Sequence, residues 1–197
     1  MDLKLKVVSV RNLTPDIKRF ELVNIDGSPL PAFEAGAHID VHTGKNQWRS
    51  YSLANDPQET NRYVTGILRE ANGQGGSKWM HDSIHEGDII EARGPLNDFP
   101  LDMSAKSHLL IAGGIGITPM LSMVNALLER GDPREVWLFY GVRNGAEQVM
   151  KAQLRALADR YSQFHLHVCY SDPRPGDLEG RDYQHRGRID IALLRAF

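Results

Sequence analysis

The sequence predicts a six-stranded antiparallel β barrel over residues 1–102, followed by a parallel-sheet α/β domain over residues 103–197. Before residue 103, short runs of alternating apolar residues are separated by turn residues, a pattern typical of antiparallel strands. After residue 103, apolar strands alternate with stretches of helical period, which indicates a parallel sheet. The composition, with 41% hydrophobic and 24% charged residues, is that of a globular chain.

The first region contains six segments of strand character. Phe20 alternates with Leu22, and Ile39 with Val41, as expected of strands that bury one face. Turn sequences such as Asp26-Gly27 separate the segments. We expect strands at 6–10, 17–23, 38–42, 48–53, 63–69 and 88–92, which predict a small barrel or sandwich, and one helix at 77–84.

The second region alternates strands with helices. Strands are expected at 108–112, 136–140 and 164–170. Thr118 is typical of a helix N-cap, Pro119 suits the first helical position, and Gly131 is a typical helix end. Two further helices are expected at 147–161 and 189–196.

Charge and cysteine content exclude several classes of function. The formal net charge is -2 and no run of like charges occurs, so neither a nucleic-acid surface nor a polybasic membrane patch is indicated. No apolar stretch is long enough to span a bilayer, and the residues after Met1 lack a signal-peptide core. The single cysteine, Cys169, excludes an internal disulfide and a cysteine-held iron–sulfur cluster, and we expect it to be a core residue. These features predict a cytoplasmic protein without a membrane or nucleic-acid partner.

The first motif with chemical meaning is Arg49-Ser50-Tyr51-Ser52. Residues two apart on a strand share a face, so the Arg49 fork and the Tyr51 ring would point the same way. An arginine can bind a phosphate, and a tyrosine offers an aromatic surface with a hydroxyl. Ser52 is small enough to let a flat ring approach. Taken alone, the motif also fits a strand with one arginine that extends to solvent.

The second motif runs from Ile67-Leu68-Arg69 to Gly75-Gly76-Ser77, which opens the expected helix. Glycines before a helix N-terminus expose backbone N–H groups to an anion, and the helix dipole favours negative charge there. Ser77 can add a hydroxyl. The alternative is a flexible turn that ends in a serine cap.

The third motif is a strand followed by Gly113-Gly114-Ile115-Gly116-Ile117-Thr118-Pro119. A buried strand that runs into glycines and a capped helix is typical of a dinucleotide pyrophosphate site. The motif departs from the Rossmann fingerprint, because Pro119 replaces the third glycine and the next strand ends at Arg143 without a ribose-binding carboxylate. A Rossmann dehydrogenase is therefore disfavoured.

A metal site has one sequence signal. His81 and His85 are four residues apart on an expected helix, but the sequence between them lacks a catalytic glutamate and no third ligand is evident. We expect no metal.

The three motifs, in this order, resemble the ferredoxin–NADP reductase superfamily, and more narrowly its phthalate dioxygenase reductase branch, with the vanillate demethylase reductases. The likeness runs from about Lys4 to the C-terminus. It implies a six-stranded antiparallel barrel that holds a flavin and a parallel sheet that holds NAD(P)H. The implied chemistry is hydride transfer from NAD(P)H to the flavin, which passes electrons onward.

The resemblance also implies site residues. Arg49 and Ser77 would bind the flavin phosphate, with Gly75 and Gly76 in the phosphate loop. Tyr51 would pack on the flavin, Ser52 would lie near its N5 atom, and Ser50 and residues 67–69 would add contacts. The nicotinamide loop would comprise Gly113, Gly114, Gly116, Thr118 and Pro119, and Arg143 would lie at the adenosine end. The catalytic assignment goes to Ser52 and Thr118, with no general acid–base residue required.

The resemblance narrows the cofactors and partners. The Leu53-Ala54-Asn55-Asp56-Pro57 continuation and the compact Gly-Gly-Ser loop favour FMN over FAD. NADH is favoured over NADPH, although Arg143 could accept a 2′-phosphate. The electron acceptor would be an oxygenase component or a separate iron–sulfur protein, and the chain would serve as the reductase component of a Rieske-type aromatic oxygenase or demethylase.

Relatives continue beyond the point where this chain ends. They add a fourth strand with a Cys-Gly-Pro motif, a fifth strand and an iron–sulfur domain, so the resemblance implies that the nicotinamide domain here is partial. The first strand of the sheet would then become an edge. We accordingly expect FMN binding with poor use of NAD(P)H, and the alternative function is a flavin-binding or partner-binding module without turnover of its own.

Overall fold

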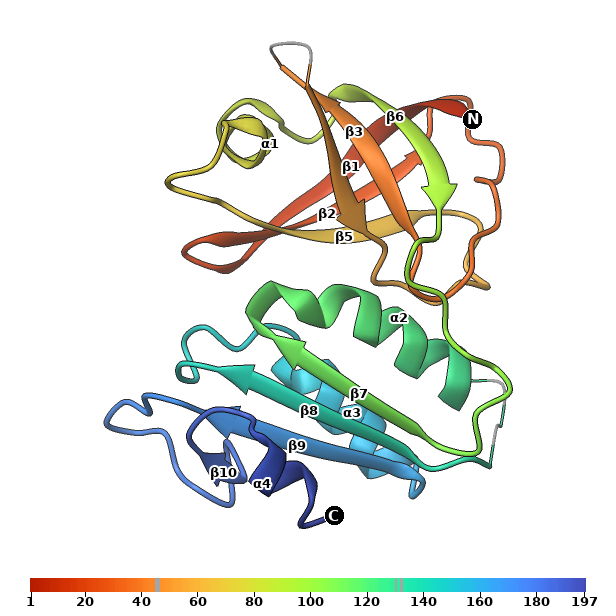
Figure 1. Ribbon diagram of the computed structural model, residues 1–197. Helices are drawn as coiled ribbons and strands as arrows, with labels where there is room; N and C mark the ends of the chain where they lie inside the picture. The colour runs from red at the N-terminus through yellow and green to blue at the C-terminus, as the bar shows by residue number, and fades with distance from the viewer. Residues whose placement is uncertain (45–46, 130, 132) are drawn as a thin grey trace.

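The computed structural model describes residues 1–44, 47–129, 131 and 133–197. Its first half is a six-stranded antiparallel sheet in the order β4-β3-β6-β1-β2-β5 (Figure 1). The two ends of this sheet meet through a bridge between Leu53, just after β4, and Thr65 in β5, so the sheet curls into a barrel. The elements are β1 (Asp2–Thr14), β2 (Ile17–Asn24), β3 (His38–Thr43), β4 (Gln47–Ser52), β5 (Tyr63–Leu68), α1 (Gly76–Ser83) and β6 (Ile89–Leu96).

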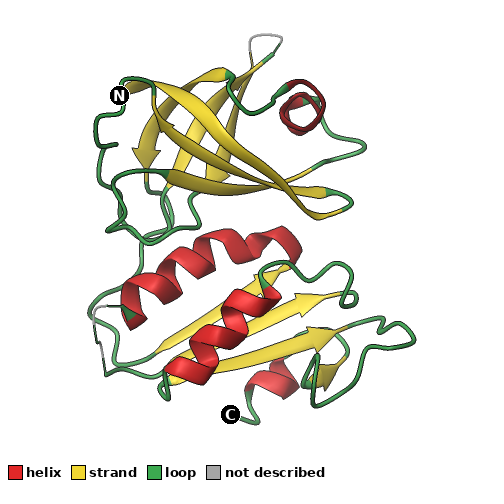
Figure 2. Ribbon diagram, turned by 180° about the vertical axis from the view of Figure 1, so that it is seen from behind, coloured by secondary structure: helices red, strands yellow, loops and turns green. Residues whose placement is uncertain are grey.

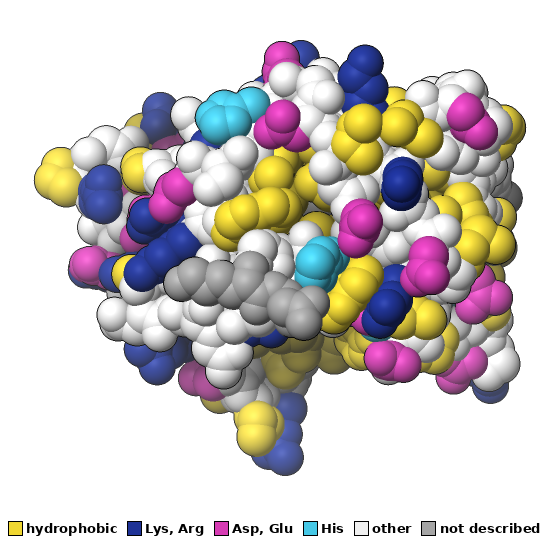
Figure 3. All heavy atoms as spheres, turned by 90° about the horizontal axis from the view of Figure 1, so that it is seen from above, with side chains coloured by type: hydrophobic (Ala, Val, Ile, Leu, Met, Phe, Trp, Pro, Cys, Tyr) yellow, Lys and Arg dark blue, Asp and Glu magenta, His cyan; other side chains and the backbone are white. Residues whose placement is uncertain are grey.

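The barrel core follows from the alternation in the sequence. Along β3, every second residue is buried, and the side chains of Ile39 and Val41 are fully inaccessible to solvent. Helix α1 covers one side of the barrel with Met80, and Ile84, directly after the helix, belongs to the same apolar core. On the outer surface, side chains of both charges are interspersed, as the view from above shows (Figure 3).

The second half is a parallel sheet in the order β10-β9-β8-β7. Helix α2 lies between the barrel and this sheet, and α3 and α4 lie on opposite faces of it (Figures 1 and 2). Its elements are β7 (His108–Gly113), a 3-10 turn (Gly114–Gly116), α2 (Ile117–Leu128), β8 (Val136–Val142), α3 (Lys151–Arg160), β9 (Phe164–Tyr170), β10 (His185–Arg186) and α4 (Ile191–Leu194). The proposed domain boundary at 102/103 falls in the connection between β6 and β7.

The expected edge strand is confirmed. Strand β7 pairs only with β8 among the described strands, and its Leu109 and Ile111 side chains are about half exposed. The β9 bounds agree with the sequence prediction, and Cys169 is buried in that strand as expected. The short parallel strand β10 was not predicted, because two residues are too few to show a period.

All four helix starts differ from the prediction, although α1 starts only one residue early, at Gly76. The N-cap role of Thr118 was wrong, because the 3-10 turn begins the helical path at Gly114 and α2 then starts at Ile117, with Gly116 as its N-cap. The Thr118 hydroxyl instead donates to the Ile115 carbonyl at 3.0 Å. Helix α3 starts at Lys151 and not at 147, since Met150 has a left-handed backbone with φ 59°. Helix α4 is shorter than expected at both ends.

Candidate functional site

A cavity of about 400 Å³ lies between the barrel and the parallel-sheet half. Strands β4 and β5, the loop before α1, the start of α1 and the start of α2 all contribute to its wall. The residues that line it are Arg49, Ser50, Tyr51, Ser52, Gly66, Ile67, Leu68, Glu70, Gly73, Gln74, Gly76, Ser77, Ile115, Gly116, Thr118 and Pro119. The first two motifs of the sequence therefore meet in one cavity, together with part of the third.

Arg49 and the first turn of α1 form one end of this cavity. A Cβ atom on Gly76 would lie 2.6 Å from Cγ of Arg49, so only glycine allows the helix to approach this side chain. Gly75 has φ +100°, a left-handed conformation that favours glycine. The Arg49 guanidinium donates to the Trp48 carbonyl and to the side-chain oxygens of Gln47 and Gln74, all of them neutral. A cationic fork beside the N–H groups of a helix start is suited to a phosphate.

Tyr51 and the open edge of β5 form the other end. The Tyr51 hydroxyl is buried and has no hydrogen-bond partner within the described part of the chain. Burial raises its pKa to about 12, so the hydroxyl keeps its proton and can donate it. On β5, Val64 turns its N–H and C=O outward, to Asn55 and Ala54. Along a strand, backbone groups of every second residue point to the same side. The N–H and C=O groups of Gly66 and Leu68 therefore also point outward, into the cavity.

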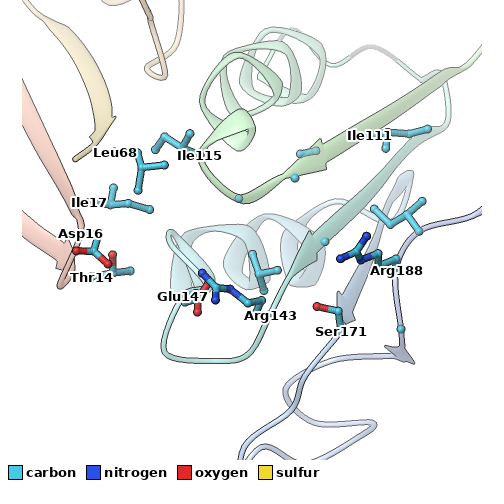
Figure 4. Close-up of a pocket in the computed structure, with 17 residues that line it drawn as sticks. Thr14, Asp16, Ile17, Leu68, Ile111, Ile115, Arg143, Glu147, Ser171 and Arg188 are labelled. Atoms are coloured by element: carbon cyan, nitrogen blue, oxygen red, sulfur yellow. The ribbon is translucent and has the colours of Figure 1, made fainter. Parts of the chain in front are cut away.

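A second cavity, of about 730 Å³, opens beside the first at the end of the parallel sheet (Figure 4). Gly113 and Gly114 of the third motif line it, together with Arg143, which the family resemblance implies as a contact. Arg143 Nε donates to the Glu147 carboxylate at 3.0 Å. The cavity therefore combines glycine backbone, an arginine and a carboxylate, the groups that bind pyrophosphate and ribose hydroxyls.

The glycine-rich turn divides its residues between the two cavities. Gly113 and Gly114 line the larger one, whereas Gly116, Thr118 and Pro119 line the smaller one. Leu68 and Ile115 line both. The two cavities are thus neighbours that share an aliphatic wall.

Two predicted contacts lie outside both linings. Arg69 makes a two-pronged ion pair with Asp82, at 3.0 and 2.8 Å, and its guanidinium turns away from the cavity. Gly75 supports the turn and is not among the residues that face the cavity. His81, the candidate metal ligand, directs Nε2 to the Ile67 carbonyl at 2.8 Å. Within the described ranges, no group of three His, Cys, Asp or Glu side chains could hold a metal.

Several lining residues were not foreseen from the sequence. Glu147 was missed because the Rossmann pattern places the carboxylate at the end of the strand, whereas this one follows five residues after Val142. The segment after β9 brings Ser171, Gly187, Arg188 and Ile189 to the larger cavity, and the β1–β2 turn brings Thr14 and Asp16. Neither segment contains a motif, so no sequence signal marks them.

Each half of the chain matches the model of a known protein family. Residues 4–100 match the model described as oxidoreductase FAD-binding domain, and residues 110–197 match the oxidoreductase NAD-binding domain. The chain belongs to the ferredoxin–NADP reductase superfamily. No helix among the described residues of this superfamily member is long and apolar enough to cross a membrane.

Similar proteins include reductases of oxygenase systems. Phthalate dioxygenase reductase from Burkholderia cepacia is 49% identical over 171 residues, which are 87% of this chain and 52% of that protein. Vanillate O-demethylase oxidoreductase from Acinetobacter baylyi is 42% identical over 160 residues, covering 81% of this chain and 49% of the relative. A solved phthalate dioxygenase reductase superposes with a TM-score of 0.80 at 42% identity, covering 91% of this chain and 55% of that chain. The chain spans about half the length of the curated relatives that it matches.

The residues of the smaller cavity fit a flavin. Its phosphate end has a cation and a glycine cradle that any Cβ would fill, and its other end has a buried hydroxyl that lacks a partner in the described chain. A flavin nucleotide carries a phosphate and a ring with several hydrogen-bonding atoms, which these groups complement. Arg49, Gly76, Ser77 and Tyr51 would hold it.

Proposed function

We propose that this chain binds FMN in the smaller cavity and NADH in the larger one, and acts as the NADH-dependent flavin oxidoreductase part of an aromatic oxygenase system. The observation that carries the proposal is the convergence of Arg49, Gly76 and Tyr51 on one cavity. When bound, the flavin would accept a hydride from NADH and release electrons one at a time. The protein positions the two cofactors and excludes water between them.

FMN is proposed over FAD because the phosphate end of the cavity suits a single phosphate group. Arg49 and the α1 start face each other closely, and the side-chain oxygen of Gln74 accepts a hydrogen bond from the guanidinium. Glu70 is among the residues that line the cavity, and a negative charge there would disfavour a second phosphate. These features support a mononucleotide, in agreement with the compact Gly-Gly-Ser loop.

NADH is proposed over NADPH because of Glu147. Its carboxylate neutralises Arg143 and lines the cavity beside it. A carboxylate accepts hydrogen bonds from ribose hydroxyls but repels a 2′-phosphate. The Arg143–Glu147 pair therefore favours the binding of NADH, which lacks the 2′-phosphate.

Each residue of the site has a proposed task. Arg49 and Ser77 bind the flavin phosphate, and Ser50 and residues 67–68 line the wall of the cavity beside the ring. Tyr51 packs on the flavin and donates a hydrogen bond to it through its hydroxyl, and Ser52 is positioned near the reacting edge. Thr118 has its hydroxyl bonded to Ile115, so it holds the glycine turn between the cavities. Gly113 and Gly114 supply backbone surface for the dinucleotide, and Gly116 and Pro119 line the flavin side of the same turn.

The electron acceptor is proposed by analogy with the relatives. The solved relative is described as a modular structure for electron transfer from pyridine nucleotides to a 2Fe–2S cluster. Vanillate O-demethylase oxidoreductase and phthalate dioxygenase reductase are named for oxygenase or demethylase systems. We propose an oxygenase component or an iron–sulfur protein as the partner of this chain.

A second candidate is a flavin-binding module without turnover of its own. The half-exposed Leu109 and Ile111 on the edge strand β7 favour it, because Ile111 belongs to the wall of the larger cavity. A wall that is open to solvent would bind NADH weakly.

The test begins with the purified protein and its spectrum. Mass spectrometry of the cofactor released on denaturation should give FMN, and the protein should absorb at about 450 nm as flavoproteins do. Bleaching of that band by NADH without oxygen then separates the two candidates, because the module would bind FMN without being reduced. Failure to bind any flavin after incubation with FMN would refute both.

A further inference from the structure

His81 connects helix α1 to strand β5, two elements that line the smaller cavity, without lining the cavity itself. It lies in the last turn of α1, and its side chain is buried, with 6% exposure of the residue. Its Nε2 atom is 2.8 Å from the carbonyl oxygen of Ile67 in β5. Its own carbonyl accepts a hydrogen bond from Nζ of Lys18 in β2, at 2.7 Å. One residue thus ties α1 to two strands of the barrel.

The two elements joined by this imidazole carry different ends of the cavity. The first turn of α1 contributes Gly76 and Ser77 at the phosphate end. Strand β5 contributes Gly66, Ile67 and Leu68 along the ring end. The distance between the phosphate end and the ring end therefore depends on how α1 is held against β5.

The imidazole is held in one orientation and one charge state. Its ring meets Phe20 edge-on, with centroids 6.5 Å apart. Burial lowers the pKa of His81, and the nearby cations Lys18 and Arg69 lower it further, against the opposing effects of the Ile67 carbonyl and Asp82. A neutral ring that faces a carbonyl must carry its proton on Nε2, so it donates to Ile67.

We propose that His81 is a positioning residue for the flavin, which sets the spacing between the phosphate end and the ring end of the cavity through its hydrogen bond to Ile67. This inference rests on the proposed function. It assigns His81 a task that neither its helix position nor its likeness to a metal ligand indicates. A ligand that is held at both ends binds best when the two ends of its site are correctly spaced. Loss of the hydrogen bond should therefore weaken the binding of FMN more than that of riboflavin, which has the ring but no phosphate.

The experiment compares the affinities of FMN and riboflavin, which differ by the phosphate. Both would be titrated into the flavin-free full chain by fluorescence quenching, for wild type, His81→Leu, His81→Asn and His81→Gln. Leu removes the donor, Asn is too short to reach Ile67, and Gln can place an N–H near the position of Nε2. His85→Gln is the matched control, because the His85 side chain is 75% exposed on the same segment.

We expect His81→Leu and His81→Asn to weaken FMN binding about tenfold, or ~1.4 kcal/mol, and riboflavin binding by a clearly smaller factor. His81→Gln should recover most of the FMN affinity, and His85→Gln should match wild type. Thermal unfolding of each flavin-free variant reports whether the barrel is intact. If His81→Leu fails to fold, the comparison of FMN affinity between His81→Gln and His81→Asn tests the proposal.

Two results would overturn the inference. One is an FMN-to-riboflavin affinity ratio that is the same in all four proteins, since a purely structural histidine would lower both affinities equally. The other is a His81→Gln variant that is as weak as His81→Asn. A wild-type chain that binds neither ligand would instead refute the flavin assignment on which the inference rests.

Discussion

Leu68 at the end of β5 and Ile115 in the 3-10 turn form a common wall of the two cavities (Figure 4). One side chain comes from the barrel and the other from the parallel-sheet half. Ligands in the two cavities would therefore contact the same aliphatic surface, which keeps water from the space between them. In the proposed function, electron transfer would take place across this shared wall, because the two halves of the chain would bring their ligands together there.

Tyr51→Phe should separate ligand binding from folding. The buried hydroxyl has no partner in the described chain, so its removal leaves no donor unsatisfied. We expect the free energy of unfolding of the flavin-free protein to stay within about 1 kcal/mol of wild type, or to rise. FMN affinity should fall about fivefold, since one hydrogen bond to the ligand is lost. Chemical denaturation and fluorescence titration measure the two effects, and a less stable flavin-free variant would contradict the assignment.

Gly76→Ala and Gly113→Ala should each weaken the binding of a different ligand. A methyl group at Gly76 would lie 2.6 Å from Cγ of Arg49 and 3.1 Å from Oγ1 of Thr43, so Arg49 must move. FMN affinity should then fall at least about tenfold.

At Gly113 a methyl group meets no protein atom within 4 Å and enters the larger cavity. Gly113→Ala should therefore keep the FMN affinity and weaken NADH binding. Titration of both variants with both ligands checks this, and equal loss of FMN in the two variants would count against two separate cavities.

Glu147→Gln should shift the preference from NADH toward NADPH. The change removes the negative charge beside Arg143 and frees the guanidinium for a 2′-phosphate. The pair is partly exposed, so we expect a change of about five- to tenfold in the ratio of the two kcat/KM values. Glu179→Gln, an exposed change outside the cavity lining, is the control. An unchanged ratio would show that selectivity is decided elsewhere.

Asp182→Asn should destabilise the protein at neutral pH but not in acid. The carboxylate is buried and pairs with Lys151 at 2.7 Å and Arg181 at 2.6 Å. Hydrogen bonds from these cations hold the pKa of Asp182 well below its ordinary value of 3.8. Because the folded pKa is the lower one, this stabilisation is complete above pH 3.8 and is lost as the pH falls toward the folded pKa.

At pH 7 the variant should therefore lose about 2 kcal/mol of unfolding free energy. The difference from wild type should shrink as the pH is lowered through the acid range. Asp159→Asn, which changes an exposed carboxylate on α3, the helix that carries Lys151, should show neither effect. A deficit for Asp182→Asn that is independent of pH would contradict the ionic role of this side chain.

The sequence predicted most of the architecture, because each element has its own periodicity. Phe20, Leu22, Ile39 and Val41 alternate, and all four are fully buried in the barrel. Two short motifs, together with the family resemblance, marked Arg49, Tyr51 and Gly76 as candidate phosphate and ring contacts, and these residues do line one cavity. Such patterns involve residues close together in the sequence, so they can be recognised without knowledge of the fold.

The boundaries and partners of residues were less predictable. Thr118 has the residue type of an N-cap, but the preceding glycines turn the chain early and the cap moves to Gly116. Arg69 belongs to the second motif, yet Asp82, thirteen residues away, takes its guanidinium. In both cases the competing interaction depends on the path of the backbone, which a residue pattern does not specify.

The sequence by itself determined that a barrel with an Arg-Ser-Tyr-Ser strand precedes a parallel sheet with a glycine-rich turn, because each of these features depends on residues that are close together in the sequence. Only the tertiary structure decided that Leu68 and Ile115 line the same two cavities, that His81 forms a hydrogen bond with Ile67, and that the residues of the glycine turn are divided between the cavities. The physical reason is that these contacts join segments whose distance is set by packing of the two halves, and packing depends on all the buried side chains together.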